Sequence, residues 1–276
     1  MMIDTIYHMN CLDGLRALPD SVVDLTLSSP PYDHLRRYND TSTWSMEFFH
    51  ELAPQLYRVT KPGGVLVWVV GDATIKGSET GSSFRQALYF MECGFRLHDS
   101  MAYAKSNTPY PEINRYYQAL EYMFVLSKGK PKTVNLIADK PNRYAGTSVH
   151  GTERNADGTT RPKSAVRKGI KREVQAYGVR TNIWTYSGGR GNTTNDAFAF
   201  AHPAMFPEKL AQDHIVSWSE PGDLVLDPFM GSGTTAKMAL INGRHYLGYE
   251  IDSEYYGIAL RRITTAKAAA GGDCGG

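Results

Sequence analysis

The sequence lacks any long apolar run. Its longest uninterrupted apolar stretch extends only from Val65 to Val70, whereas a helix that spans a membrane needs about 20 apolar residues. The first ten residues, MMIDTIYHMN, lack the basic start and apolar core of an export signal. With 276 residues and 42% apolar content, the chain is long enough to bury a large core. We therefore expect a folded, soluble protein that is neither exported nor bound to a membrane.

Cysteine is also scarce. The three cysteines, Cys11, Cys93 and Cys274, are odd in number and far apart, which argues against a disulfide framework and against a zinc site. The eight histidines show no ligand spacing such as His-x-x-x-His. These absences predict a reducing, cytoplasmic location and no bound metal.

The net charge of +2 conceals a local excess of basic residues. Between Pro131 and Asn195 the sequence has 12 Lys and Arg against 4 Asp and Glu, and half of those 12 lie in RPKSAVRKGIKR, Arg161 to Arg172. Such a stretch is either a solvated surface loop or a patch that neutralises phosphates. The sequence alone leaves both interpretations open.

Apolar runs alternate with helical patterns in the order expected of an α/β fold with a doubly wound, mostly parallel sheet. Strands are expected at 22–27, 61–70, 96–105, 120–128, 223–229 and 245–251. Helices are expected at 45–59, 82–95, 207–219, 233–243 and 253–269, with Ser82 or Ser83 as the N-cap of the second. We expect residues 1–130 and 196–268 to form two halves of one domain, 131–195 an insertion, and 269–276 a disordered tail.

A glycine turn lies in DLVLDPFMGSGTTAKMA, where Gly231 and Gly233 stand between a strand and a helix. Glycine there lets a ligand approach the backbone and the first N–H groups of the helix. Glu250 ends the next strand, 19 residues after Gly231, where a carboxylate can accept both hydroxyls of a ribose. The pattern predicts a nucleoside site, although close helix–strand packing or a dinucleotide-binding domain would also explain it.

Asp227 comes just before these glycines. A carboxylate there would repel a pyrophosphate, but it suits the cationic end of S-adenosylmethionine. This favours a methyl donor over NAD. The alternative is that Asp227 caps the following helix.

Three motifs together resemble a known family. They are SSPPY at Ser28 to Tyr32, HPAMFPEKL at His202 to Leu210, and DPFMGSGTT at Asp227 to Thr235. Their content and order resemble the amino-group DNA methyltransferases of the beta arrangement, and the likeness covers Ile6 to about Arg262. It implies a Rossmann-like S-adenosylmethionine-dependent methyltransferase fold, a double-stranded DNA substrate, and a target-recognition role for the basic insertion. Relatives belong to restriction–modification systems and are sometimes dimers, but no segment specifies an interface.

The resemblance also assigns roles in the proline corner. The Ser29 hydroxyl and the Pro30 carbonyl would accept the hydrogens of the target amine, which frees the nitrogen lone pair for attack on the methyl group. Pro31 would hold the loop, and Tyr32 would stack on a base that has left the duplex. No Pro-Cys dipeptide occurs, so methylation of the cytosine ring carbon is excluded.

Further residues follow from the same resemblance. The cofactor would be contacted by Asp227, Phe229, Gly231, Gly233, Thr234 and Glu250, by Asn10 or Asp13 near its adenine, and by His202 near its methionine end. For His202, a buried histidine bonded to a loop carbonyl is the alternative. The residues expected to contact DNA are Arg36, Arg37, Arg167, Lys168, Lys171 and Arg172, and for Arg36 and Arg37 a solvated helix end is the alternative.

Serine in first place of SSPPY, and HPAMFP in place of the form common in adenine relatives, favour cytosine N4 over adenine N6. An adenine-N6 methyltransferase is the nearest alternative. A catalytically inactive DNA-binding module and an NAD oxidoreductase explain fewer of the motifs.

Overall fold

The computed structural model describes residues 2–31, 44–106, 113–163, 168–169, 172–189 and 191–271. The chain divides into two compact units. One consists of Met1–Asn135 together with Asn182–Gly276, and the other of Leu136–Thr181. The smaller unit lies within the insertion expected at 131–195, whose role in target recognition stays a prediction.

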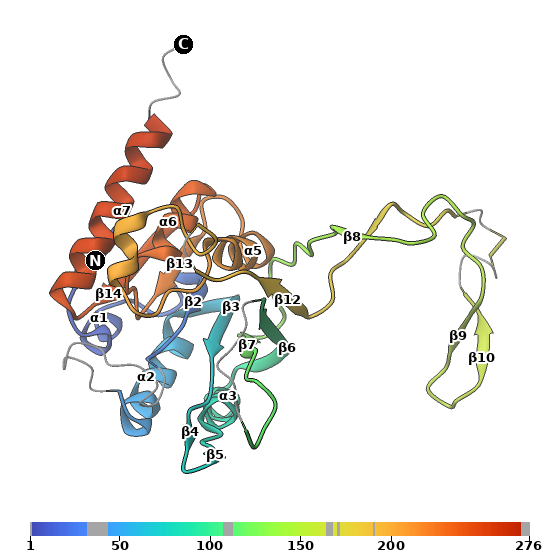
Figure 1. Ribbon diagram of the computed structural model, residues 1–276, viewed down its shortest axis with the longest axis horizontal. Helices are drawn as coiled ribbons and strands as arrows, with labels where there is room; N and C mark the ends of the chain where they lie inside the picture. The colour runs from blue at the N-terminus through green and yellow to red at the C-terminus, as the bar shows by residue number, and fades with distance from the viewer. Residues whose placement is uncertain are drawn as a thin grey trace. The chain divides into compact units, whose positions relative to one another are not determined.

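The larger unit is built on one eight-stranded sheet (Figure 1). Its strands, in spatial order, are β1 (Thr5–His8), β14 (His245–Glu250), β13 (Leu224–Asp227), β2 (Val23–Ser28), β3 (Thr60–Val70), β7 (Leu120–Ser127), β6 (Arg96–Lys105) and β12 (Ile183–Tyr186). Neighbouring strands are parallel except that β7 is antiparallel to both β3 and β6. The expected doubly wound, mostly parallel sheet is confirmed.

Helices cover both faces of this sheet (Figure 1). The helices α1 (Cys11–Arg16), α2 (Met46–Val59) and α3 (Ser82–Glu92) pack side by side, as do α5 (Glu208–Trp218), α6 (Thr234–Ile241) and α7 (Ser253–Gly271). Central strands between two helical layers have no solvent-facing side, so they are apolar throughout. The run Val65 to Val70 of β3 is accordingly at most 1% exposed.

The smaller unit contains two short antiparallel pairs. They are β8 (Lys140–Pro141) with β11 (Tyr177–Gly178), and β9 (Thr152–Arg154) with β10 (Thr160–Pro162). A further hairpin, β4 (Thr74–Ile75) with β5 (Ser78–Glu79), belongs to the larger unit. Strands of two or three residues show too little alternation for a sequence pattern to reveal them.

Three local expectations were wrong or incomplete. The N-cap of α3 is Gly81, and the Asp72 carboxylate accepts the Ser83 N–H at 2.9 Å, so neither Ser82 nor Ser83 is the cap. The helix α7 continues through Gly271 and overlaps the tail expected from residue 269, whose remainder lies outside the described residues. The edge strands β1 and β12 were not foreseen.

Among the described helices, none combines the length and the apolar character that crossing a membrane requires.

Candidate active site

One cavity of about 380 Å³ collects the segments that carry the predicted motifs. It lies at the carboxyl ends of the parallel strands, around the point where β13 and β2 are neighbours and the chain leaves them in opposite directions along the sheet. Ligands of doubly wound sheets bind at such a switch point. The lining residues at or just after the ends of β1, β2, β13 and β14 are Met9, Asn10, Cys11, Ser29, Pro31, Asp227, Pro228, Phe229, Met230, Gly231, Ser232, Thr234, Glu250, Ile251 and Asp252.

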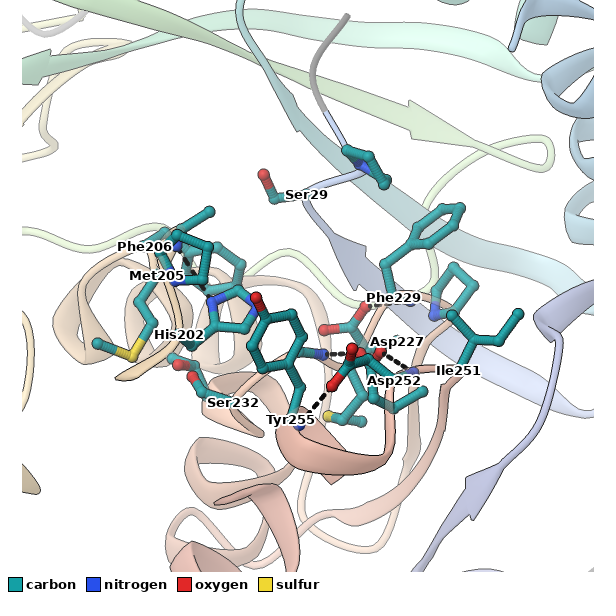
Figure 2. A pocket seen from close by; sticks show the side chains of 18 of the residues that line it. Ser29, His202, Met205, Phe206, Asp227, Phe229, Ser232, Ile251, Asp252 and Tyr255 are labelled. Atoms are coloured by element: carbon teal, nitrogen blue, oxygen red, sulfur yellow. Dashed lines mark hydrogen bonds between the residues drawn. The ribbon is translucent and has the colours of Figure 1, made fainter. Parts of the chain in front are cut away.

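The proline corner and the glycine turn therefore border the same space. Figure 2 shows Ser29, His202, Asp227 and Tyr255 around it. Pro31 also lines the cavity, whereas Pro30 is buried beside it. Tyr32, predicted to stack on the flipped base, and Arg36 and Arg37, predicted to contact DNA, lie outside the described residues.

Asp227 is buried at the end of β13 and is only 2% exposed. Its Oδ1 accepts hydrogen bonds from the Ser28 hydroxyl at 2.6 Å and from the Phe229 N–H at 3.0 Å. Burial raises the pKa of this carboxyl to about 6, against the effect of the hydroxyls of Ser28 and Thr235 and of the Phe229 N–H. The helix α6 begins after Gly233 with no side-chain cap, so the alternative that Asp227 caps this helix is wrong.

Glu250 ends β14 and is 9% exposed. Its Oε2 accepts the Gly231 N–H at 2.7 Å, and its Oε1 accepts the Asp252 N–H at 2.9 Å. Burial raises the pKa of Glu250 above its usual range, while these two N–H groups oppose the rise. A carboxylate has about four acceptor sites, so two backbone bonds leave room for hydroxyl donors of a ligand.

His202 packs directly over the glycine turn. Its Nδ1 accepts the Ala204 N–H at 3.1 Å, which assigns the proton of the neutral ring to Nε2. A Cβ placed on Gly231, whose φ is +51°, would lie 2.9 Å from that Nε2, so only glycine fits. The Tyr255 ring stands edge-on to the imidazole at 4.4 Å.

Asn10 and Asp13, the two candidates near the cofactor's adenine, differ in their surroundings. The Asn10 side chain accepts the Leu12 N–H at 2.8 Å, caps α1 and lines the cavity. The Asp13 side chain is 67% exposed, lies 3.8 Å from Arg16, and does not line the cavity. Of the two candidates, Asn10 therefore borders the cavity and Asp13 does not.

The remaining predicted cofactor residues, Phe229, Gly233 and Thr234, belong to the same glycine turn. Phe229 and Thr234 line the cavity. Gly233, with φ +84°, is not among the lining residues, and a Cβ there would lie 3.0 Å from Ala259 of α7. Its role is to let α7 pack closely against the turn.

Arg262 of α7 forms hydrogen bonds with the glycine turn, and this role was not predicted from the sequence. It is fully buried and donates to the Ser232 carbonyl at 3.1 Å and to the Thr234 hydroxyl at 2.9 Å. It also forms ion pairs with Asp196 and Glu208. An arginine in a helical pattern reads as an exposed residue, and no local signal reveals its burial.

Three more unforeseen residues line the cavity from β6 and β7: Tyr103, Lys105 and Glu121. Lys105 Nζ lies 2.5 Å from Glu121 Oε1. The alternation of side chains along β6 predicts that Tyr103 and Lys105 lie on the same face of the sheet. It does not predict which face of the sheet borders the cavity.

The thiol of Cys11 also borders the cavity, and burial raises its pKa to about 12. It therefore stays protonated and is a poor nucleophile. In the part of the chain that the structure describes, no three His, Cys, Asp or Glu side chains are arranged to hold a metal ion.

On the smaller unit, Lys168 and Arg172 are exposed. Arg167 and Lys171, predicted with them to contact DNA, lie outside the described residues. Nearby, Arg161 pairs with Glu153 at 2.7 Å.

Comparison with known proteins gives consistent matches. A family model for N6 and N4 methyltransferases, described as DNA methylase, matches residues 23–261. The orphan methyltransferase M.BamHII of Bacillus amyloliquefaciens is 56% identical over 246 residues, which are 88% of this chain and 89% of that protein. The DNA adenine methyltransferase YhdJ of Escherichia coli K12 is 26% identical over 269 residues, 95% of this chain and 83% of that protein.

Two solved structures share the fold. The PvuII DNA methyltransferase, described as cytosine-N4-specific, has a TM-score of 0.68 at 21% identity, and the match covers 97% of this chain and 92% of that one. The M1.HpyAVI–SAM complex has a TM-score of 0.60 at 22% identity, with 94% and 98% covered.

Proposed function

This chain belongs to the DNA methylase family of N6 and N4 amino-methyltransferases, and on that premise we propose that it methylates the exocyclic N4 amine of a flipped cytosine in double-stranded DNA. It is a DNA amino-methyltransferase that uses S-adenosylmethionine. The observation that carries the proposal is the single cavity shared by Ser29 and by the Asp227 to Thr234 turn.

The residues present fit this cofactor. Gly231 leaves a cradle that a Cβ would fill, Glu250 has acceptor sites left for ribose hydroxyls, and Asp227 offers a carboxylate to a cationic group. His202 Nε2–H and Asp227 would hold the methionine end, and Glu250 the ribose. When bound, S-adenosylmethionine supplies a methyl group activated by a sulfonium.

The protein's own residues prepare the amine. Ser29 Oγ and the Pro30 carbonyl accept its two hydrogens, which draws the nitrogen lone pair out of the ring. Pro30 and Pro31 each fix their own φ, so these acceptors stay in place while the base enters. Holding two reactants in register supplies about 7–11 kcal/mol in well-oriented systems, and we assign most of the rate enhancement to this effect.

Cytosine N4 is favoured over adenine N6 by Ser29 in first place of the motif and by HPAMFP. The PvuII enzyme, described as cytosine-N4-specific, supports this choice, and YhdJ, described as an adenine methyltransferase, supports the alternative. Either amine can donate to the same two acceptors, so the choice rests on the motif.

A direct experiment identifies the base. Genomic DNA is incubated with the enzyme and isotopically labelled S-adenosylmethionine, digested to nucleosides and analysed by mass spectrometry. Labelled N4-methylcytosine is expected from the wild type and is reduced by several orders of magnitude with Ser29→Ala, which should bind the cofactor normally. Labelled N6-methyladenine would overturn the choice of base, and no labelled nucleoside would overturn the activity.

We further propose that the basic insertion, including Lys168 and Arg172, contacts DNA phosphates, and that the enzyme acts in the cytoplasm, as its cysteine content predicts. The first proposal fits a substrate with a dense negative charge, and the second depends on the cysteine content alone.

A further inference from the structure

The cavity continues beyond Ser29, away from the cofactor residues. In the sheet, β13 and β14 lie on one side of β2, and β3, β7 and β6 lie on the other. Asp227 and Glu250 come from the first side. Tyr103 and Lys105 of β6 and Glu121 of β7 come from the second.

These three side chains share one face of the sheet. Tyr103 is directly opposite Glu121 in the antiparallel pair, and Lys105 is two residues further along β6. Side chains two apart on a strand point to the same face. Lys105 thus reaches Glu121 diagonally, with 2.5 Å between Nζ and Oε1.

Stability alone does not explain a charged pair at this place. The Glu121 side chain is only 9% exposed and that of Lys105 35%. Withdrawing a carboxylate such as that of Glu121 from water costs several kcal/mol, and an apolar pair of similar volume is often as stable as a buried ion pair or more so. The pair also borders the cavity, so its charges are available to a ligand that the cavity holds.

The position of the Lys105–Glu121 pair in the sheet indicates which part of a bound base it would contact. The target amine must lie beside Ser29, at the end of β2. With strands spaced about 4.8 Å apart, β7, which carries Glu121, is about 10 Å from β2, and β6, which carries Lys105, is about 14 Å from it. A base whose amine is held at Ser29, and whose ring extends away from the cofactor, can direct the far end of its Watson–Crick edge toward the side of the cavity lined by Lys105 and Glu121.

We propose that Lys105, held in place by Glu121, donates a hydrogen bond to O2 of the flipped cytosine and thereby selects cytosine over adenine. This inference rests on the proposed function. Lysine has three N–H donors, so one can serve Glu121 while another serves the base. Cytosine presents the O2 acceptor on the edge that carries its amine, whereas adenine presents a carbon-bound hydrogen there. With adenine in the site, the Lys105 ammonium would face that hydrogen and would lack the acceptor that O2 of cytosine provides. A polar site discriminates in this way against an analogue that lacks the hydrogen-bonding group.

The test uses two duplexes that carry the sequence methylated by the wild type and differ only in having cytosine or adenine at the target position. Wild type, Lys105→Met, Lys105→Gln and Glu121→Gln are compared by kcat/KM on each duplex and by S-adenosylmethionine affinity. Lys132→Met is the control, because Lys132 also faces a carboxylate, Asp223, at 3.7 Å but does not line the cavity.

We expect Lys105→Met to lower kcat/KM on cytosine by about 10- to 100-fold, with cofactor affinity and the slow rate on adenine unchanged, so that discrimination falls by the same factor. Glu121→Gln should show a smaller loss of the same kind, and Lys132→Met none. If Lys105→Met does not fold, Lys105→Gln decides the matter with the same readouts.

The outcomes separate the two proposals. A wild type that methylates cytosine, with Lys105 variants that keep full discrimination or lose both bases equally, would overturn this inference alone. A wild type that methylates adenine, or no base, would overturn the proposed function and this inference with it.

Discussion

The hydroxyl of Ser28 donates a hydrogen bond of 2.6 Å to Oδ1 of Asp227, a residue 199 positions later in the chain. The bond joins the ends of the neighbouring parallel strands β2 and β13, so it connects the strand that leads into the proline corner with the one that leads into the glycine turn. The two serines of SSPPY therefore differ: Ser28 is fully buried in the sheet, and Ser29 borders the cavity.

Ser28→Ala should weaken S-adenosylmethionine binding by about 10-fold at pH 7, the typical effect of removing a hydrogen bond to a charged group. The Ser28 hydroxyl lowers the pKa of Asp227, so its loss raises that pKa further and leaves less carboxylate to attract the cofactor. Calorimetric titration measures the change. Thr26→Val is the matched control, because Thr26 is equally buried on β2 and its hydroxyl has no hydrogen-bond partner among the described residues. Equal effects of both variants would show that Ser28 acts only by packing.

Cofactor affinity should depend on pH through Asp227. Its pKa of about 6 in the folded protein means that the carboxylate is present above pH 6 and becomes neutral as the pH falls through this value. A neutral carboxyl attracts a cationic cofactor less, so affinity should decline toward 10-fold per pH unit below 6. Titrations from pH 5 to 8 should show this decline in the wild type and a flatter profile in Asp227→Asn. An identical profile in the variant would assign the titration to another group, such as Glu250.

Gly231→Ala should impair both stability and cofactor binding. The added methyl group would lie 2.9 Å from His202 Nε2, so the imidazole must move away from the turn. Gly222→Ala is the control, because Gly222 also has a positive φ, +85°, but a Cβ there meets nothing within 4 Å. The difference in urea midpoint between the variants isolates the steric effect, and cofactor affinity should fall only in Gly231→Ala. A loss of similar size in both would mean that the backbone conformation alone matters.

Arg262→Met should destabilise the protein by about 3–5 kcal/mol, since it leaves the carboxylates of Asp196 and Glu208 with Lys237 as their remaining cationic partner among the described residues. Arg261→Met on the same helix should cost far less, because Arg261 is exposed and stacks on Phe198. Chemical denaturation of both variants measures this. Comparable losses of stability in both variants would argue that the ion pairs of Arg262 with Asp196 and Glu208 do not stabilise the protein.

Replacing Lys168 and Arg172 by glutamine should reduce the salt dependence of DNA binding. Each lost phosphate contact lowers the slope of log K against log[salt] by about 0.9, so the pair should lower it by up to about 2. Arg16→Gln with Lys267→Gln removes the same charge from the other unit and should leave the slope nearly unchanged. Equal slopes for the wild type and both double variants would indicate that Lys168 and Arg172 are solvated surface residues that do not contact DNA phosphates.

Local signals in the sequence determined the strands β2 and β13, the proline corner, the glycine turn and the acid at Glu250. Each depends on residues close together in the chain: prolines that cannot donate, glycines that accept a positive φ, and apolar runs that must be buried. Apart from the short helix α1, the helices of both layers followed from their periodicity in the same way.

Only the tertiary structure decided which of these pieces meet. Sequence patterns carry no strand order, so they could not show that Ser28 reaches Asp227, that Lys105 and Glu121 border the cavity of Ser29, or that Arg262 is buried while Arg261 is not. For the same reason they could not show that Asn10 lines the cavity whereas Asp13 is exposed and does not. Short edge strands such as β1 and β12 are fixed by the neighbours they pair with, because four residues of alternation are too few to specify a strand by themselves.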